Sequence, residues 1–347
     1  MPSPMTELTI AAVEVPRWDN HIVLSERVTP STQLEIFGYR SPARFTAPEI
    51  RFSEPQSLLV TGDKFTIITE RAGLVPGSTY LFDEYRWQDL FASPRTIIPT
   101  RDVPTLVSGN AAWINYSHWL FQCLPPILLA PVAGLNDFDA LLPPLNPVQR
   151  DYLRLAGMDP GRIIELPAGT AALPRLGIYS NLTAGDFPYL PHPAIVSAFE
   201  RLAAHAPRSA FAGRRVFLSR ADTGNRAMIN EAELRSQLEA DGYAVVVPGA
   251  LGVLEQIALF RDASLIVGQH GAALTNLLFA PRGEEGPIVV ELQQENYPAL
   301  AFVKICQVKR LRYTAIFGRM VDPGADGRHD STWEADIPLV RKTLADL

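Results

Sequence analysis

The fold is decided by the stretch "SLIVGQHGAALTNLLFA", residues 264–280. An apolar run with strand-like residue types ends at Gly268, and Ala272 begins a second apolar run that we expect to be a helix. A strand followed closely by a helix is typical of parallel α/β proteins, which bind ligands at the carboxyl ends of their strands. The loop with His270 and Gly271 is therefore a candidate ligand site.

The same alternation extends on both sides of this loop. The patterns predict helices over residues 194–206, 231–240 and 253–262 and strands over residues 215–219, 244–248 and 288–292. Strands separated by helices imply a parallel sheet that is covered on both faces. A last amphipathic segment, residues 335–347, predicts a terminal helix.

The N-terminal half has a different texture. Short runs within residues 57–83, "SLLV", "KFTIIT" and "STYLF", are separated by turn residues and predict antiparallel strands. After residue 107 an α/β pattern follows, with strands expected over residues 139–142, 162–166 and 176–180 and helices around His118 and over residues 149–156.

The turn-rich, proline-rich stretch 183–193 predicts a linker between domains. We expect an N-terminal domain over residues 1–190, β-rich to about residue 100 and α/β after it. A second domain follows over residues 191–320, and a C-terminal tail and helix over residues 321–347.

Composition and charge narrow the class of protein. The chain has 347 residues, 47% of them hydrophobic, and a net charge of −6 that disfavours a nucleic-acid surface. We expect neither a secretory leader nor a membrane span, and hence a cytoplasmic protein. Cys123 and Cys306 lie in apolar stretches and predict buried thiols. Asp137 and Asp139 precede an apolar run instead of following a strand, so we interpret them as a turn and expect no metal.

Three polar positions follow the predicted strand 215–219: Arg220, Arg226 and Asn230. Guanidinium groups bind phosphate oxygens in pairs and helix N-termini offer free N–H groups, so together they could neutralise a diphosphate. A structural alternative stays open, because Asn230 and Glu233 also fit a helix N-cap with its capping-box partner.

In the central loop, Gly271 would let a ligand approach the backbone. The helix expected from Ala272, with Thr275 and Asn276 in its first turns, would favour negative charge at its N-terminus. His270 could donate to a phosphate oxygen or cap the neighbouring loop. The spacing is neither G-x-G-x-x-G nor a Walker motif, which disfavours nicotinamide cofactors and ATP hydrolysis.

A carboxylate, Glu291, lies at the end of the otherwise apolar strand 288–292. It could accept hydrogen bonds from ribose hydroxyls, or it could merely face solvent. Because the carboxyl ends of parallel strands meet at one edge of a sheet, we expect the three loops to converge there.

The ordered motifs "NYSHWLFQCLPPILL", "FLSRADTGNRAMINEAEL", "LEQIALFRDASLIVGQHGAALTNLLFA" and "VVEL" resemble glycosyltransferase family 61, over residues 109–292. The resemblance implies a GT-B-like two-domain fold with Rossmann-like sheets, an inverting mechanism, a nucleotide-sugar donor such as a UDP-sugar, and no metal or other cofactor. Positions that match the family's donor-site motifs are Arg220, Arg226, Asn230, His270, Gly271, Ala272, Thr275, Asn276 and Glu291. Gln256 matches a helix glutamine that either packs or binds ligand. Gly252 and Pro126 depart from the family pattern.

An inverting transfer needs a base for the acceptor hydroxyl, and His118 is the candidate. With Ser117 as a helix cap, His118 would lie beside Gln122, off the apolar face and near a helix N-terminus that keeps a histidine neutral. It could instead hydrogen-bond Tyr116 or the backbone and only pack. Expected acceptor-side contacts are Asn115, Tyr116 and Trp119.

The sequence therefore predicts a hexosyl- or pentosyltransferase. We expect it to build bacterial capsular polysaccharide, exopolysaccharide or lipopolysaccharide on a glycan or lipid-linked glycan acceptor, with peripheral contact at the inner face of the cell membrane. The alternative is a noncatalytic nucleotide- or sugar-binding protein of the same fold in a polysaccharide assembly complex. A sugar-nucleotide epimerase, which would use the donor alone, is a more distant alternative.

Overall fold

The computed structural model describes residues 8–18, 21–28, 44–70, 73–75, 95–183, 191–325 and 330–347. The chain forms two compact units, Met1–Val13 with Thr46–Ala198, and Glu14–Phe45 with Phe199–Leu347. Both contain parallel strands, so the predicted α/β class is confirmed, whereas the GT-B arrangement stays a prediction. The strand expected within "STYLF" and most of the linker expected over 183–193 lie outside the described residues.

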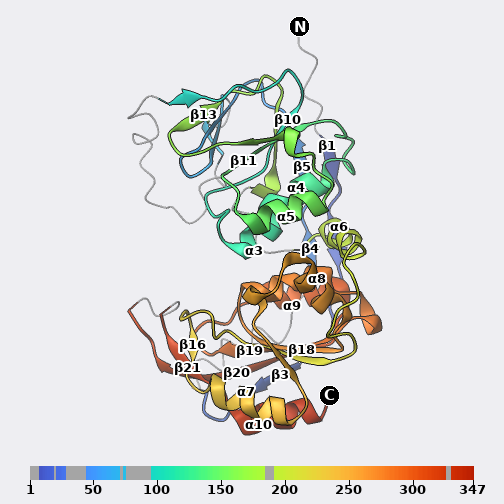
Figure 1. Cartoon of the computed structure of the whole chain (residues 1–347), viewed down its shortest axis with the longest axis vertical. Helices are drawn as coiled ribbons and strands as arrows, with labels where there is room; N and C mark the ends of the chain where they lie inside the picture. The colour runs from blue at the N-terminus through green and yellow to red at the C-terminus, as the bar shows by residue number, and fades with distance from the viewer. Residues whose placement is uncertain are drawn as a thin grey trace. The chain divides into compact units, whose positions relative to one another are not determined.

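An eight-stranded sheet forms the centre of the second unit (Figure 1). Its order is β16-β21-β20-β19-β18-β15-β17, and β3 pairs with β20 off this path. The strand bounds are β3 His21–Leu24, β15 Arg215–Leu218, β16 Ala227–Met228, β17 Ala244–Val246, β18 Leu265–Gln269, β19 Ile288–Gln294, β20 Tyr313–Asp322 and β21 Thr332–Glu334. Strands β17, β15, β18 and β19 run parallel, as the alternating pattern predicts. Strands β20 and β3, which the pattern did not indicate, continue the parallel part of the sheet.

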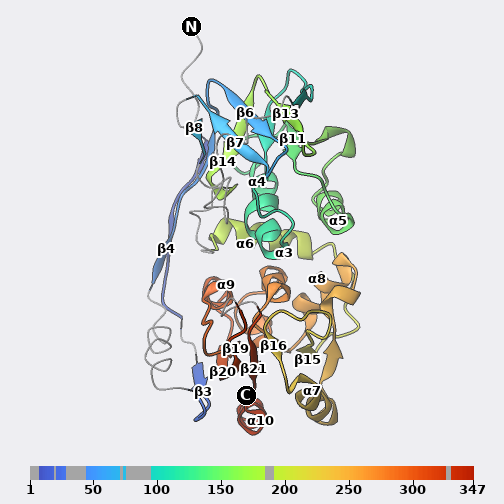
Figure 2. The same ribbon diagram turned by 90° about the vertical axis from the view of Figure 1, so that its left-hand side faces the viewer.

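Helices cover both faces of this sheet (Figures 1 and 2). On one face lie α8 (Val253–Asp262) and α9 (Ala301–Lys309), and on the other lie α7 (Glu231–Ala240) and α10 (Ile337–Ala345). Val290 and Leu292 of β19 belong to the core that includes α7 and α10. Because side chains alternate along a strand, Glu291 between them projects to the opposite face, toward α9.

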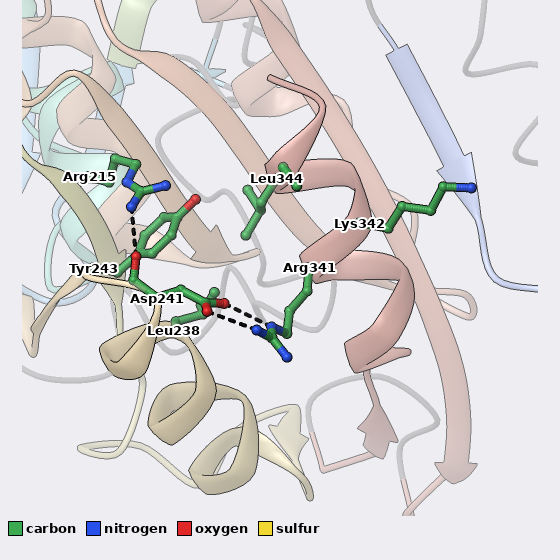
Figure 3. A pocket seen from close by; sticks show the side chains of 8 residues that line it. Arg215, Leu238, Asp241, Tyr243, Arg341, Lys342 and Leu344 are labelled. Atoms are coloured by element: carbon green, nitrogen blue, oxygen red, sulfur yellow. Dashed lines mark hydrogen bonds and ion pairs between the residues drawn. The ribbon is translucent and has the colours of Figure 1, made fainter.

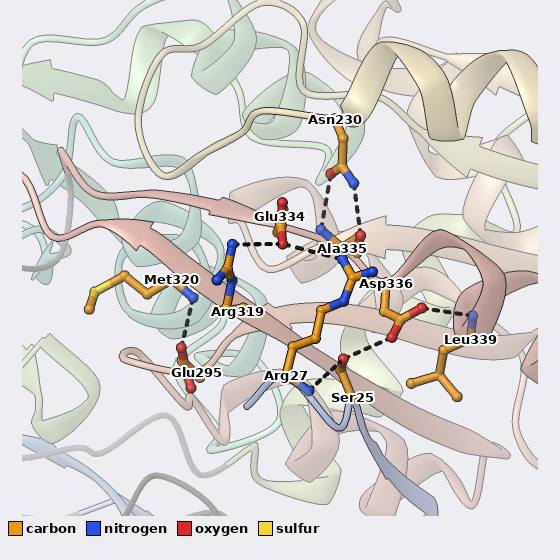
Figure 4. A network of polar contacts seen from close by, with 10 residues as sticks. All are labelled: Ser25, Arg27, Asn230, Glu295, Arg319, Met320, Glu334, Ala335, Asp336 and Leu339. Carbon is orange, nitrogen blue, oxygen red and sulfur yellow. Dashed lines mark hydrogen bonds and ion pairs between the residues drawn. The ribbon is translucent and has the colours of Figure 1, made fainter. Parts of the chain in front are cut away.

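Two segments join the second unit although the expected partition placed them elsewhere. Residues 14–45 belong to it, because β3 pairs with β20 and the Trp18 indole donates to the Leu311 carbonyl oxygen at 2.8 Å. The C-terminal segment belongs to it as well, because β21 pairs with β20. Figure 4 shows the polar contacts that link these segments, including Ser25 Oγ donating to Asp336 at 2.8 Å.

The first unit contains a six-stranded sheet and a five-stranded sheet. The first has the order β1 (Leu8–Ile10), β5 (Ile50–Ser53), β14 (Gly177–Ser180), β10 (Thr105–Val107), β11 (Asp139–Leu142) and β12 (Ile163–Glu165), with the last four strands parallel. The second has the order β8 (Gly73–Leu74), β7 (Thr66–Thr69), β6 (Leu58–Thr61), β13 (Thr170–Ala172) and β9 (Thr96–Ile97). The predicted β-rich N-terminal region is therefore confirmed.

The remaining described elements are short. Strands β2 (Val13–Val15) and β4 (Phe45–Ala47) pair with each other, and helix α5 (Pro147–Leu155) begins at a capping box of Asn146 and Gln149. The other helices include α6 (Pro193–Ala203) and the 3-10 helices Pro160–Arg162, Asn181–Thr183, Pro248–Ala250 and Gly283–Glu285. Within the described ranges, no helix combines the length and the apolar character needed to span a bilayer.

Candidate functional site

The loop after β15 brings two guanidinium groups to one carbonyl oxygen. Arg220 donates to the His270 oxygen at 2.6 Å and to the Asn225 oxygen at 3.0 Å, and Arg226 donates to the same His270 oxygen at 3.5 Å. Burial, and then the charge of Arg226, lower the pKa of Arg220 to about 10, so it stays protonated at neutral pH. Both acceptors of Arg220 are neutral carbonyl oxygens, and the carboxylates of Glu231 and Asp222 act on its charge without a direct ion pair among the described residues.

The carboxylate of Glu231, the first residue of α7, ties this loop to the ends of two strands. One oxygen accepts from Ser219 Oγ at 2.6 Å and from the Arg220 amide at 2.8 Å, and the other accepts from Gln269 Nε2 at 2.8 Å. Sequence reasoning missed Glu231. The sequence feature that could have indicated Glu231 is an acidic residue at the first position of a predicted helix, directly after a loop rich in arginine.

Arg226 is held in a left-handed backbone conformation, with φ at 52°. The Trp333 indole donates to its carbonyl oxygen at 3.0 Å, and its guanidinium carbon lies 5.5 Å from the Tyr297 ring centroid. A non-glycine residue in this conformation costs about 1–3 kcal/mol, so the surrounding contacts must hold it. Trp333 and Tyr297 are further site residues that sequence reasoning missed, because both are distant in sequence.

The side chain of Asn230, which precedes α7, is hydrogen-bonded to the backbone of Ala335, which follows β21 (Figure 4). Its Nδ2 donates to the Ala335 oxygen at 2.8 Å and its Oδ1 accepts from the Ala335 amide at 3.0 Å. It precedes α7 but makes no side-chain cap, so the alternative of a capping box with Glu233 is wrong. Both groups of the amide are engaged by backbone, which gives Asn230 a structural task next to the arginine loop.

The side chain of His270 is fixed by a buried carboxylate. Its Nδ1 lies 2.5 Å from Glu291 Oε1, and the Tyr313 hydroxyl donates to the other oxygen of Glu291. Glu291 is fully buried, and it is in the interior of β19, which continues to Gln294 instead of ending at residue 292 as expected. The ring of His270 packs against Phe302, with centroids 5.0 Å apart.

The segment after Gly271 differs from the expected α-helix, because Ala272–Phe279 is a 3-10 helix. Ala272 is exposed, whereas Thr275 and Asn276 are fully buried. Asn276 donates to Gln256 Oε1 at 3.1 Å, and Gln256 donates to a backbone carbonyl of the preceding loop. Thr275 and Asn276 therefore lie in the core beneath the loop, and Gln256 makes the buried contact that sequence reasoning left as one of two options.

Gly271 is required by Arg220. A Cβ atom at this position would lie 1.9 Å from Arg220 Nη1. The backbone of Gly271 is extended, with φ at 175°, which any residue adopts. The reason for glycine here is therefore the close approach of a guanidinium group, and no special backbone conformation is involved.

The His118 segment is a composite helix. It consists of α3 (Tyr116–His118), a π-helix over Trp119–Cys123 and α4 (Leu124–Leu129). The expected cap at Ser117 is wrong, because Asn115 Oδ1 accepts from the amides of Ser117 and His118 instead. Trp119, expected on the acceptor side, is buried with 1% exposure, while Tyr116 is half-buried and hydrogen-bonds Tyr152 at 2.7 Å.

His118 is part of a buried polar network. Its Nδ1 lies 2.7 Å from Gln122 Oε1, which also accepts from Asn110 Nδ2 at 3.0 Å. Because a carbonyl oxygen only accepts, Nδ1 carries the proton and Nε2 is the basic nitrogen of the neutral ring. Burial lowers the pKa of His118, so the ring is neutral at pH 7 as expected, although the cause is desolvation and not the helix N-terminus.

The Asp137 and Asp139 carboxylates and the two cysteines have structural contacts. Arg101 and Arg162 both donate to the buried carboxylate of Asp139, and the hydrogen bond from Arg101 is the main cause of its lowered pKa. Arg162 also pairs with Asp137 at 2.6 Å. The two cysteines are buried thiols as predicted, and burial raises the pKa of Cys123 to about 12.

A cavity of about 460 Å³ lies at the opposite, amino-terminal edge of the strands in the second unit (Figure 3). Arg341 pairs with Asp241 through two contacts of 2.8 Å. Arg215, the first residue of β15, donates to the Asp241 carbonyl and stacks over Tyr243. Arg341 is thus neutralised by Asp241, and this cavity lies away from the carboxyl ends of the parallel strands, where such sheets bind ligands, so the arginine loop is the better candidate site.

An α/β unit with guanidinium groups gathered after parallel strands is typical of proteins that bind phosphorylated ligands. Comparison with known proteins is more specific: residues 116–286 match the model of the family described as Glycosyltransferase 61. The chain therefore carries a glycosyltransferase 61 region, which confirms the family resemblance. It is also 34% identical over 120 residues to the EGF domain-specific O-linked N-acetylglucosamine transferase of Drosophila melanogaster. That alignment covers 33% of this chain and 22% of the relative.

Proposed function

We propose that the chain is an inverting glycosyltransferase that needs no metal and moves a sugar from a nucleotide-sugar donor to a glycan acceptor. The observation that carries the proposal is the convergence of Arg220, Arg226 and His270 beyond β15 and β18, inside a region that matches glycosyltransferase 61. A UDP-sugar is the first donor to test. The name of the Drosophila relative mentions N-acetylglucosamine, so among UDP-sugars we propose to test UDP-N-acetylglucosamine first.

The arginine loop supplies the charge that the leaving group requires. Negative charge grows on the nucleoside diphosphate as the glycosidic bond breaks, and fixed donors lower the barrier by stabilising it. Arg220 donates to neutral carbonyl oxygens, and Arg226 adds a second guanidinium group beside it. This arrangement supports departure of the diphosphate without a cation.

His118 is the proposed base. Its Nδ1 proton is held by Gln122, so Nε2 can accept a proton from an acceptor hydroxyl. The exposed Asn115 and the half-buried Tyr116 precede His118 in the chain, and we propose that they contact the acceptor. Trp119 is buried and packs in the core instead.

The proposed acceptor is a growing glycan or lipid-linked glycan of bacterial capsular polysaccharide, exopolysaccharide or lipopolysaccharide. This setting would place the protein in the cytoplasm, with peripheral contact at the inner face of the membrane. A glycan acceptor and a protein acceptor such as an EGF domain, suggested by the relative's name, are distinguished by supplying each with the same donor.

The test is calorimetry with UDP, GDP, ADP and CMP in the presence of EDTA. Wild type should bind one nucleoside diphosphate selectively, and Arg220→Ala should lose that binding. Arg261→Ala is the control and should retain binding: Arg261 also donates to backbone carbonyls, those of Ala203, Ala206 and Pro207, but its charge is neutralised by Asp262. Binding that requires a divalent cation would contradict the metal-independent mechanism. Nucleotide binding without sugar transfer to any acceptor would favour the noncatalytic alternative.

A further inference from the structure

The buried carboxylate of Glu291 is fully occupied by two protein groups. His270 Nδ1 lies 2.5 Å from one oxygen, and the Tyr313 hydroxyl donates to the other. Tyr313 lies on the adjacent strand, where Val289 pairs with Tyr313 and Glu291 with Ala315, so the two side chains share one face of the sheet. A carboxylate with 0% exposure cannot reach a ribose without rearrangement of this face.

The chemistry of the contact fixes the state of the histidine ring. A carboxylate accepts hydrogen bonds and does not donate them, so His270 Nδ1 must carry a proton. The second ring nitrogen, Nε2, then lies on the far side of the ring from Glu291. The side chain of His270 is 14% exposed, so part of the ring reaches the surface.

The main chain of the same residue holds the arginines. The His270 carbonyl oxygen accepts from both Arg220 and Arg226. Only a displacement of the His270 main chain on loss of Glu291 would also move the acceptor of the arginine pair. His270 joins the carboxylate beneath the site to the cations within it.

We propose that Glu291 and Tyr313 are positioning residues of the donor site. They hold His270 by its Nδ1 proton and direct Nε2 toward the diphosphate of the nucleotide-sugar. On diphosphate binding, Nε2 takes up a second proton from solvent, and the resulting imidazolium donates from Nε2 to a phosphate oxygen. The inference rests on the proposed function, and it replaces a direct contact between Glu291 and ribose with action through His270.

The first experiment needs no nucleotide. Nitrogen NMR of the histidine side chains, with the His270 signals identified by their loss in His270→Gln, reports which ring nitrogen carries the proton above neutral pH. We expect the proton on Nδ1 in wild type. A ring protonated on Nε2 with a bare Nδ1 would overturn the proposal even if nucleotide binding is normal.

The second experiment is a double-mutant cycle on UDP binding, or on binding of whichever nucleoside diphosphate wild type prefers. Glu291→Gln keeps the shape but removes the charge, and we expect about a tenfold loss of affinity from the weakened charged hydrogen bond. In the His270→Ala background the same change should have no further effect, because Glu291 acts through the ring. Tyr313→Phe should cause a smaller loss.

Glu295→Gln is the matched control, since Glu295 is also buried, directly follows β19 and accepts from the Met320 amide at 2.8 Å. It should retain wild-type affinity. An effect of Glu291→Gln that persists undiminished in His270→Ala, or wild-type affinity in Glu291→Gln, overturns the positioning role. If wild type binds no nucleoside diphosphate, the proposed function fails, and the NMR result still decides how His270 is held.

Discussion

A single methyl group at Gly271 should separate ligand binding from folding in the second unit. In Gly271→Ala the new Cβ would lie 1.9 Å from Arg220 Nη1, and 3.0 Å from the guanidinium carbon. The clashing atoms are the far end of a flexible side chain, so Arg220 can swing away. Doing so removes its hydrogen bonds to the carbonyl oxygens of His270 and Asn225.

The size of the effect follows from what is lost and what is kept. A hydrogen bond from a charged group contributes about 1.5–3 kcal/mol, so loss of both bonds should decrease the free energy of unfolding by up to about 3–6 kcal/mol. The extended backbone at residue 271 accepts alanine without strain, so no further cost arises there. Displacement of one of the two converging guanidiniums should weaken nucleoside diphosphate binding by about tenfold or more.

The assay combines urea denaturation with calorimetry of the nucleoside diphosphate that wild type prefers. Gly224→Ala is the control, because its Cβ would meet no atom within 4 Å and it lies in the same loop as Arg220 and Arg226. If Gly271→Ala and Gly224→Ala bind equally well, Arg220 does not act in the donor site. If Gly271→Ala unfolds outright, the clash is not relieved by the side chain as reasoned.

Three further outcomes are expected. His118→Ala should lower kcat by about a hundredfold or more at unchanged nucleotide affinity. The control is His192→Asn, which replaces a buried histidine that accepts from the Ala194 amide and should leave kcat unchanged. Because burial lowers the pKa of His118, the basic form persists below pH 6.5, so the acid limb of the kcat/KM profile should lie below that value; a limb above pH 6.5 would contradict the burial argument. Burial also lowers the pKa of Lys309 from 10.5 to about 8, so the unfolded chain binds more protons between these values and stability should rise with pH there. The contribution is about 3 kcal/mol, and a comparison of Lys309→Met with wild type by denaturation at pH 8 and pH 10 should show the rise in wild type alone.

The parallel sheet of the second unit could be predicted because its strands and helices have clear lengths and periods. Helices α7 and α8 begin and end where the pattern placed them, since each starts at an acidic first turn and ends where the apolar period stops. The apolar run after Gly271 carries no such signal. A segment buried on all sides shows no period, so the 3-10 helix over Ala272–Phe279 could not be distinguished from an α-helix.

The π-helix in the His118 segment differs from the continuous α-helix that was expected. The two prolines that favour it were visible in the sequence, but they did not by themselves predict it. Pro125 and Pro126 have no amide hydrogen, so they cannot donate to the carbonyls of the preceding turn. The Leu124 amide bonds instead to Trp119, five residues back, and closes the π-helix. The surrounding turn is widened beside His118, as π-helical turns often are at functional positions.

The contacts of Glu291 could not be predicted at all. Its partners His270 and Tyr313 are 21 and 22 residues away, and their meeting depends on the register of β18, β19 and β20. Sequence placed the carboxylate at the right strand but could not tell a ligand contact from a contact with the histidine. The register of three strands is a property of the tertiary structure, which explains why the contact of Glu291 with His270 was not predicted.

The arginines of the chain differ in the acceptors they bind, and this difference locates the site. Arg341 forms an ion pair with Asp241, and Arg101 and Arg162 form ion pairs with Asp139. Arg220 binds carbonyl oxygens beside Arg226, and the unfavourable burial of its charge appears as a pKa lowered to about 10. A bound diphosphate would offset that cost by adding negative charge to that of Glu231 and Asp222, so burial of Arg220 favours binding of an anion. Arg341 would gain no comparable affinity from a bound anion, because Asp241 already neutralises its charge.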